Sequence, residues 1–382
     1  MNPQKVPRSA ASFPTPSGPP FLQPKPTTQT ASGIALKPNN FQLRPSLRLH
    51  QWLAEQNLCF AFTTYQSGQV FVIGRKADDS LLYTVRTYEH AMGITVHGDE
   101  MHLGTLYQVW HFRNRLPSGT VQADYDAVFT PRSCHVTGHV AIHDLAMEDS
   151  GRLVFVSTMF NCLATVDNEY NLRPIWKPPW ITGITAGDRC HINGLGVRHG
   201  IVRYVTAVAR VDALDGWRSC RVGSGVIWDV VEERAVAEGQ TMPHSPRWHD
   251  GRIWFINSGT GYLCSICPEG GSPTQVCFIP GFARGLALFG DYALVGTSAQ
   301  RSNRTFSDLP LEQNLAKAGL VGRCAVHIIN IRTGQIEHQL HIDGDIQELY
   351  DLAVLPGKRL ANVIGFLNED VRKITDVAPT QF

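Results

Sequence analysis

Fifteen histidines stand out in this chain of 382 residues. Four of them, His90, His143, His191 and His244, each open a short apolar segment that leads into a glycine turn. Neutral imidazole is a common ligand of zinc, iron and copper, and its pKa leaves it largely unprotonated at neutral pH. If the fold brings these four side chains together, they predict a transition-metal site. The alternative is that they line a channel and hydrogen-bond to water.

Two further segments of the same kind begin with Arg284 and Tyr350. The guanidinium of Arg284 could bind a substrate carboxylate or phosphate, or it could form a salt bridge with Asp351 or Glu348. The phenol of Tyr350 could donate or relay a proton, or it could pack as an aromatic plug. We therefore treat Arg284 and Tyr350 as candidate catalytic residues, and Arg284 also as a candidate substrate-binding residue.

The ligand types indicate which metal to expect. The aligned positions offer neither the carboxylates that calcium and magnesium prefer nor the thiolates that structural zinc sites favour. An all-histidine set with open positions suits Fe(II), copper or catalytic zinc, and we favour Fe(II) because it could then bind O₂. Carboxylates near the histidines could accept imidazole N–H groups and orient the rings; they are Asp144, Glu348, Asp351 and Glu89.

The six segments recur along the chain, with first positions 53, 48, 53, 40 and 66 residues apart. Each is followed by a second apolar strand, which predicts an all-β fold, a β-propeller whose innermost strands line a central channel. We expect six blades, with seven as the alternative if Phe60 opens its own blade. Strands between about residues 58 and 87 would complete the last blade, and this closure of the ring would remove exposed sheet edges.

Composition divides the chain into two parts. Residues 1–43 are rich in proline and poor in large apolar side chains, which predicts a disordered or loosely packed leader. Residues 44–382 are expected to form a single propeller domain. The loop of residues 170–189 should overhang the histidine ring. Its Trp176 and Trp180, and His139 on the approach to His143, are therefore candidate substrate-binding residues.

The charge balance narrows the choice of partners. The chain has 34 basic and 33 acidic residues, a net charge of +1, and lacks the basic surplus typical of nucleic-acid-binding proteins. No apolar run is long enough to span a membrane, and the N-terminus shows no secretory signal. Nine scattered cysteines favour reduced thiols and a cytoplasmic location. We expect a small-molecule substrate, without nucleic acid or membrane as partner.

The sequence from about residue 47 to 377, with its units HDLA (143–146) and YDLA (350–353) and the segment CHINGLG (190–196), resembles a bacterial family of uncharacterised proteins. That resemblance brings no activity with it. At the level of architecture, the expected site is similar to two kinds of propeller. Carotenoid cleavage oxygenases hold a non-haem iron with four histidines, and peptidyl amidoglycolate lyases have histidine-bound zinc beside Arg and Tyr.

We therefore expect a metal-dependent enzyme with a four-histidine site, a non-haem iron oxidoreductase or oxygenase acting on a small organic substrate. A zinc-dependent lyase or hydrolase on the same site is the first alternative. A non-catalytic propeller that serves as a binding scaffold is the second.

Overall fold

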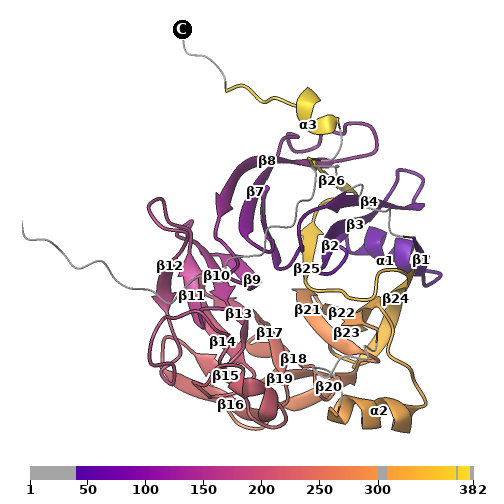
Figure 1. Cartoon of the computed structure of the whole chain (residues 1–382). Helices are drawn as coiled ribbons and strands as arrows, with labels where there is room; N and C mark the ends of the chain where they lie inside the picture. Colours follow the sequence, from indigo (N-terminus) through magenta and orange to yellow (C-terminus); the bar gives the residue numbers. More distant parts are fainter. Residues whose placement is uncertain (1–39, 300–307, 367–368, 379–382) are drawn as a thin grey trace, which may run out of the picture. The chain divides into compact units, whose positions relative to one another are not determined.

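The computed structural model describes residues 40–299, 308–366 and 369–378, and most of the predicted leader, residues 1–39, lies outside them. The described residues form six small sheets arranged in a ring (Figure 1). The prediction of an all-β, six-bladed propeller is therefore confirmed. We name each blade after its innermost strand, the strand that lies nearest the central channel.

Three blades are built mainly from residues 94–240. The β5 blade contains β5 (Ile94–His97), β6 (Glu100–Gly104), β7 (Gln108–Asn114), β8 (Ala127–Val136) and the short strand β26 (Ala361–Val363). The β9 blade contains β9 (Ile142–Met147), β10 (Leu153–Ser157), β11 (Cys162–Thr165) and β12 (Arg173–Trp176). The β13 blade contains β13 (Ile192–Arg198), β14 (Ile201–Ala207), β15 (Gly225–Asp229) and β16 (Arg234–Gln240).

The other three blades complete the ring. The β17 blade contains β17 (Pro243–His249), β18 (Arg252–Asn257), β19 (Tyr262–Ile266) and β20 (Thr274–Phe278). The β21 blade contains β21 (Phe282–Phe289), β22 (Tyr292–Ser298), β23 (Ala325–Asn330), β24 (Gln335–Gly344) and β1 (Phe41–Pro45). The β25 blade contains β25 (Leu352–Pro356), β2 (Leu58–Thr64), β3 (Gln69–Arg75) and β4 (Leu81–Thr87).

The ring closes where strands from the two ends of the chain pair. The C-terminal strand β25 is innermost and pairs with β2, with Phe62 opposite Leu352, so the N-terminal strands complete the last blade as predicted. Two further pairings cover outer edges. Strand β1 pairs with β24, and β26 pairs in parallel with β8. Closure of this kind leaves fewer unpaired strand edges exposed to solvent.

Apolar side chains fill the spaces between neighbouring blades. Every residue of β2 is buried, which explains why its first five residues, Leu58 to Phe62, are all apolar, with no alternation of polar residues. Phe62 and Phe71 stack with ring centroids 4.7 Å apart inside the cluster shared by the β21 and β25 blades. Each blade is therefore held mainly by its contacts with the next one.

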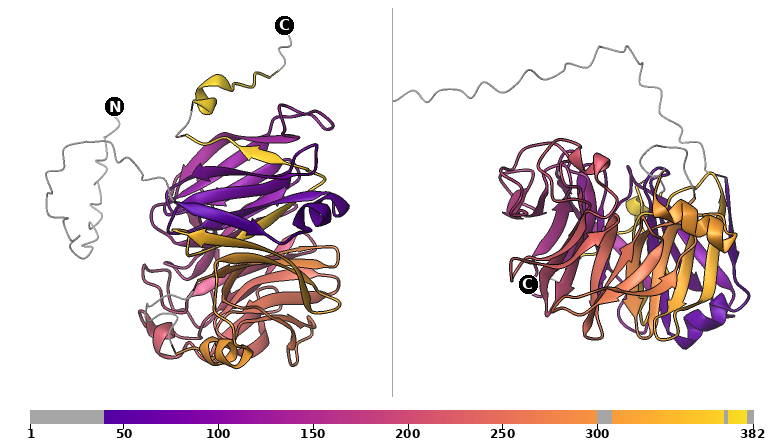
Figure 2. Two further views of the ribbon diagram at one scale, coloured as in Figure 1. Left: turned by 90° about the vertical axis from the view of Figure 1, so that its right-hand side faces the viewer. Right: turned by 90° about the horizontal axis from the view of Figure 1, so that it is seen from below.

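The helices are short and lie outside the sheets; they are α1 (Leu49–Glu55), the 3₁₀ helix η1 (Gly216–Ser219), α2 (Pro310–Ala318) and α3 (Asp370–Lys373). Helices α1 and α2 lie toward opposite faces of the ring (Figure 2, right). Helix α2 ends at Gly319 in the left-handed conformation, a common way for a helix to end. In the described part of the chain, none of the helices has the length and apolarity needed to cross a membrane.

A buried ion cluster lies in the channel. Arg247 on β17 donates to both carboxylate oxygens of Asp144 on β9, over 2.7 and 3.2 Å, and lies 3.7 Å from a carboxylate oxygen of Asp351. Although burial opposes the charge on Arg247, the two carboxylates raise its pKa. Burial and the charge of Asp144 raise the pKa of Asp351, while Arg247 partly offsets the rise. We call Asp144, Arg247 and Asp351 the channel ion cluster.

This channel ion cluster also bonds to the backbone of the remaining inner strands. Arg247 donates to the carbonyls of Leu195 on β13, over 2.6 Å, and Leu286 on β21, over 3.0 Å. Asp144 accepts the N–H of Leu195, and Asp351 accepts the N–H groups of Ile94 on β5 and Leu352 on β25. Three side chains thus connect all six inner strands.

Replacing Arg247 by Met should lower the free energy of unfolding by about 3–5 kcal/mol, because it would leave two buried carboxylates without their counter-charge. Denaturant unfolding at pH 7.5 measures this loss. The matched control is Arg44→Met, which removes an exposed ion pair with Asp343 and should cost under about 1 kcal/mol. Equal losses in the two variants would contradict the role given to the channel ion cluster.

Stability should fall as the pH drops below about 6.5, because His327 on β23 is only 1% exposed and burial lowers its pKa to about 3. The neutral form is held in the fold, so the stabilisation is present above the ordinary histidine pKa and is lost as pH falls toward the depressed value. At pH 5 this one residue should account for about 2 kcal/mol. Unfolding curves at pH 7.5 and 5.0 should therefore differ less in His327→Gln than in the parent or in the exposed-site variant His199→Gln.

Candidate functional site

Three of the predicted histidines lie at the mouth of the channel where the inner strands begin. His143 and His244 are the second residues of β9 and β17, whereas His191 directly precedes β13. The equivalent position in β13 is occupied by Asn193. His191 instead corresponds to Ala141 and Met242, the residues that directly precede β9 and β17. All three have a left-handed backbone, with φ of 52° for His191, 54° for Ala141 and 52° for Met242. A left-handed conformation is unfavourable for such residues and is often found at functional sites.

The ring of His143 is fixed by two oxygen atoms. Its Nδ1 lies 2.7 Å from the hydroxyl of Thr158 and 3.1 Å from the carbonyl of Ala141. The Thr158 hydroxyl itself donates to the carbonyl of Ile192 over 2.6 Å, so its oxygen is left as an acceptor. His143 must therefore carry its proton on Nδ1, which leaves the lone pair on Nε2.

His244 repeats the same arrangement one blade further on. Its Nδ1 lies 2.9 Å from both the carbonyl of Met242 and the hydroxyl of Ser258. Ser258 donates to the carbonyl of Ala283 over 2.7 Å. The proton of His244 is therefore also on Nδ1, and its Nε2 is a lone-pair atom.

His191 is oriented by a carboxylate instead. Its Nδ1 lies 2.7 Å from Asp188, and the indole N–H of Trp217 donates to the same carboxylate oxygen over 2.9 Å. Trp217, from η1, also lies against the imidazole with ring centroids 4.3 Å apart. Burial opposes ionisation of Asp188, but His191, His143 and Trp217 together hold its pKa below the usual range.

Burial keeps two of these imidazoles neutral. It lowers the pKa of His143 to about 3, with a further contribution from His191. It lowers the pKa of His244 well below the usual value, and the nearby charge of Arg284 acts in the same direction. Both side chains therefore keep a lone pair on Nε2 across the physiological range.

The histidines, Arg284 and Tyr350 come together at this mouth. The ring centroids of His143 and His191 are 4.9 Å apart, and those of His143 and Tyr350 are 5.5 Å apart. The guanidinium carbon of Arg284 lies 5.2 Å from the centre of the Tyr350 ring. Arg284 also forms a 2.7 Å salt bridge with Glu348. We call His143, His191, His244, Arg284 and Tyr350 the histidine cluster.

Several buried polar atoms at the start of the inner strands have no hydrogen-bond partner among the described residues, including Nε2 of His244, the hydroxyl of Tyr350 and Nδ2 of Asn193. Their side chains are 3%, 5% and 3% exposed. Burial raises the pKa of Tyr350 well above its usual value, so its hydroxyl keeps its proton. Buried groups of this kind normally have a partner, which indicates a binding site.

Two carboxylates and one guanidinium surround the imidazoles. Asp188 and Glu348 contribute two negative charges, Arg284 contributes one positive charge, and His143 and His244 are neutral. The lone pairs on Nε2 of His143 and His244 could therefore accept a metal ion or a hydrogen-bond donor.

Four of the other residues predicted for the site lie outside the histidine cluster. His90 is 36% exposed, lies 3.2 Å from Glu89 and packs against Tyr65, whose ring centroid is in turn 5.5 Å from that of Tyr350. His139 is exposed. Trp176 is on β12, the outermost strand of its blade. Trp180 packs against Trp228 of the β13 blade, with ring centroids 5.3 Å apart.

The predicted carboxylates divide into three roles. Glu89 lies beside the imidazole of His90, and Glu348 pairs with Arg284. Asp144 and Asp351 bind Arg247 and the backbone of the inner strands in the channel ion cluster, and the structure shows no hydrogen bond from either of them to an imidazole.

Sequence reasoning missed Asp188, Trp217, Thr158, Ser258 and Asn193. A signal existed for the two hydroxyl residues, because Thr158 and Ser258 each follow the second strand of a blade whose first strand carries a histidine at position two. Asp188 stands three residues before His191, but this spacing does not predict a contact unless the conformation of the turn between them is known. Nothing in the sequence pointed to Trp217, which reaches the site from a separate 3₁₀ helix.

Among residues 40–299, 308–366 and 369–378, no group of three or more His, Cys, Asp or Glu side chains is spaced to hold a metal ion. The ring centroids of His143 and His191 are 4.9 Å apart, but neither His244 nor another described His, Cys, Asp or Glu side chain completes a metal-binding set with them.

The fold is similar to that of solved structures at low sequence identity. A chain from the crystal structure of a nidogen/laminin complex is 8% identical and has a TM-score of 0.48, and the match covers 78% of this chain and 99% of that one. A catalytically inactive virginiamycin B lyase from Staphylococcus aureus, in complex with quinupristin, is 11% identical with a TM-score of 0.38, and the match covers 79% and 99%. Likenesses as low as these carry no argument about function.

No curated protein matches the chain. A family model described as a domain of unknown function (DUF4915) matches residues 47–364.

The hydrogen bonds of His143 and His244 predict that both imidazoles are the Nδ1–H tautomer at pH 7.5. Nitrogen-15 NMR spectra of histidine-labelled protein, assigned with His143→Gln and His244→Gln, would show this directly. Replacing Ser258 by Ala should loosen the tautomer preference of His244 while leaving that of His143 unchanged. An Nε2–H form for either residue in the parent protein would contradict the geometry described above.

Proposed function

Because the chain belongs to a family described only as a domain of unknown function (DUF4915), we propose its function from its own site. The proposal is a metal-dependent enzyme in which His143, His191 and His244 hold a transition-metal ion at the channel mouth. It differs from the expectation drawn from the sequence in one respect: His90 is not among the ligands.

One observation carries this proposal. Each of the three imidazoles is held through Nδ1 by a fixed oxygen atom, so each is oriented with its Nε2 available. Metal-bound histidines are typically held in this way by a carboxylate, carbonyl or hydroxyl partner. The unpartnered Nε2 of His244 and the two carboxylates beside the cluster, Asp188 and Glu348, support the same conclusion.

Binding would require a rearrangement. Because the described side chains are not gathered at metal-ligand spacing, the ring of His244 would have to approach those of His143 and His191.

Three neutral nitrogen ligands with open positions suit Fe(II), copper or catalytic zinc. Iron would supply O₂ chemistry for an oxidoreductase, and zinc would supply an acidified water for a lyase or hydrolase. We favour iron, with the zinc enzyme as its alternative. In either case the hydroxyl of Tyr350, which keeps its proton, would donate a hydrogen bond to the substrate, and Arg284 would present positive charge to a small organic substrate while Glu348 holds the guanidinium in place.

A second candidate function needs no metal. The 2.7 Å contact between Asp188 and His191 is the geometry that orients a histidine as a general base. In this version His191 would accept a proton from the substrate through Nε2, and Asp188 would stabilise the imidazolium that forms. A non-catalytic binding scaffold is the remaining alternative.

Metal analysis separates these functions. The protein, purified after expression with iron, copper and zinc supplied, should retain about one equivalent of one metal per chain. The variants His143→Gln and His244→Gln should lose it because each removes a ligand. Asp188→Asn, which weakens the support of His191, should lower the affinity by about 10–100-fold.

The matched control is His90→Gln, which replaces the histidine outside the cluster and should retain metal as the parent does. A parent protein that retains none of the three metals and shows no saturable binding of added Fe(II), Zn(II) or Cu(II) would overturn the metal proposal. Equal loss in His90→Gln and His143→Gln would overturn the choice of ligands. Circular dichroism of each variant confirms that the fold is intact.

A further inference from the structure

A groove of about 480 Å³ lies between the β17 and β21 blades and is lined by none of the inner strands. Its volume is within the range of about 300–1,000 Å³ that is typical of small-molecule sites. Strands β18, β19 and β20 form one wall, which carries Arg252, Trp254 and Val276. The turn between β23 and β24 forms the other wall, which carries Ile331 and Arg332. We call this site the blade groove.

Arg252, at the start of β18, presents a positive charge that has no carboxylate partner among the described residues. Its Nε donates to the hydroxyl of Ser265 over 3.1 Å, and its Nη1 donates to the sulfur of Cys267 over 3.3 Å. Ser265 is 3% exposed, so the arginine is held from inside the blade. A partly buried guanidinium that is fixed in this way and lacks a counter-charge favours an anionic ligand.

A second guanidinium comes from the opposite wall. The Nε of Arg332 donates to Asp291 over 2.6 Å, which orients the side chain. Within the described residues, neither Nη atom of Arg332 forms a hydrogen bond, so both remain available to a ligand. Two guanidinium groups from neighbouring blades thus line one groove, and each can bind a carboxylate or phosphate through two N–H groups.

The turn that carries Arg332 has a fixed conformation. The backbone N–H groups of Arg332 and Thr333 donate to the side-chain oxygen of Asn330 over 3.0 and 3.2 Å. Gly334 has a φ of 72° and lies so close to β20 that a Cβ there would be 2.5 Å from the carbonyl oxygen of Val276. The two walls are therefore in contact at this point, and the groove is formed before a ligand binds.

The groove also has apolar lining. Trp254, Val276 and Ile331 line it and belong to one hydrophobic cluster. The indole N–H of Trp254 already donates to the carbonyl of His249 over 3.1 Å. The apolar part of a ligand could lie against these side chains while its charged group meets the guanidinium groups.

One acidic side chain, Asp250, lines the groove as well, in the turn between β17 and β18. It is exposed, and solvent and salt screen the charge of an exposed carboxylate. Asp250 should therefore weaken the binding of an anion without preventing it.

We propose that the blade groove binds a small organic anion, whose carboxylate or phosphate group pairs with Arg252 and Arg332 and whose apolar part lies against Trp254, Val276 and Ile331. This site is independent of the metal proposal, because no residue of the histidine cluster lines it.

Isothermal titration calorimetry of the full chain with benzoate, phenyl phosphate and benzyl alcohol tests this proposal. An ionic strength of about 0.01 M keeps the screening of charges weak. At least one of the two anions should bind saturably, and the tighter one identifies the group that the arginines prefer. Benzyl alcohol should bind at least about tenfold more weakly than that anion, because it lacks the charge.

Substitutions locate the site. Arg252→Met should weaken binding of the tighter anion by at least about tenfold, and Arg252→Lys should weaken it less, because lysine keeps the charge but not the fork of N–H groups. Asp250→Asn should strengthen binding by up to about fivefold, since it removes an opposing charge. The matched control is Arg113→Met in the β5 blade, which removes a 62% exposed arginine outside the groove and should leave the affinity unchanged.

Absence of saturable binding of both anions by the folded parent would overturn the proposal. Benzyl alcohol binding as tightly as the anions would overturn the requirement for charge. Equal affinity in Arg252→Met and Arg113→Met would overturn the assigned location. Arg332→Met should also weaken binding, which gives a second measurement should Arg252→Met fail to fold.

Discussion

The salt bridge between Arg247 and Asp144 is the interaction on which the arrangement of the blades depends. It crosses the channel, and through Asp351 and the bonded backbone groups it connects all six inner strands. Each blade of a propeller contacts only its two neighbours. The central channel therefore stays open unless side chains fill it. Here charged groups fill the channel, and they are tolerated because each of them has several hydrogen-bond partners.

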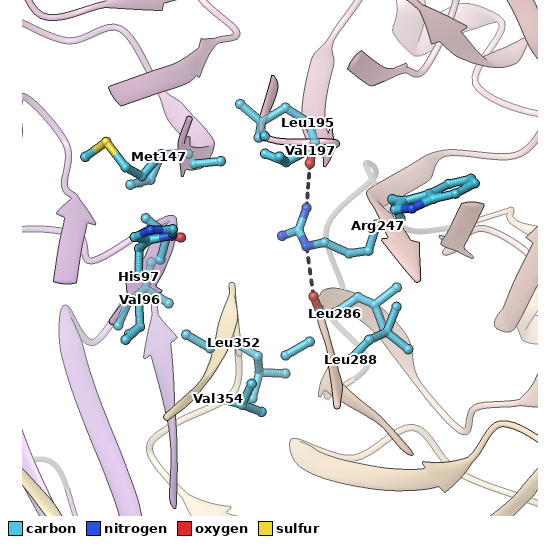
Figure 3. Close-up of a pocket in the computed structure, with 18 of the residues that line it drawn as sticks. Val96, His97, Met147, Leu195, Val197, Arg247, Leu286, Leu288, Leu352 and Val354 are labelled. Carbon is cyan, nitrogen blue, oxygen red and sulfur yellow. Dashed lines mark hydrogen bonds between the residues drawn. The ribbon is translucent and has the colours of Figure 1, made fainter. Parts of the chain in front are cut away.

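The channel ion cluster also divides the channel into two different environments. On one side lie the neutral imidazoles of His143 and His244 and the protonated hydroxyl of Tyr350. On the other side lies a pocket of about 400 Å³ that Arg247 enters (Figure 3). Both environments use the same inner strands, since the histidine cluster is built from the starts of the strands and the pocket from their ends.

The repeat pattern in the sequence predicted the propeller, its six blades and the completion of the last blade by N-terminal strands. It did not predict that β26 leaves this blade and pairs with β8. The spacing of the six segments and the glycine turns recur because each blade is a small sheet that packs against its neighbours in the same way. The positions of the histidines relative to the inner strands were harder to predict from the sequence. His143 and His244 occupy equivalent positions, but His191 stands two residues earlier, in a left-handed conformation that no spacing rule signals. In the loop of residues 170–189, Trp176 lies on the outermost strand of its blade and Trp180 packs against the next blade, whereas Asp188 at the end of the same loop reaches His191.

The sequence by itself determined which strands form, how the chain closes into a ring, and that histidines begin several inner strands, because these properties depend on local patterns and on repeat length. Only the tertiary structure decided which side chains meet. The partners Asp188, Trp217, Thr158 and Ser258 reach the imidazoles from turns and from a 3₁₀ helix. Likewise, Arg247 rather than Arg284 connects the inner strands. Such contacts join residues that are distant in the chain, and their geometry depends on the exact rotation of each strand around the channel.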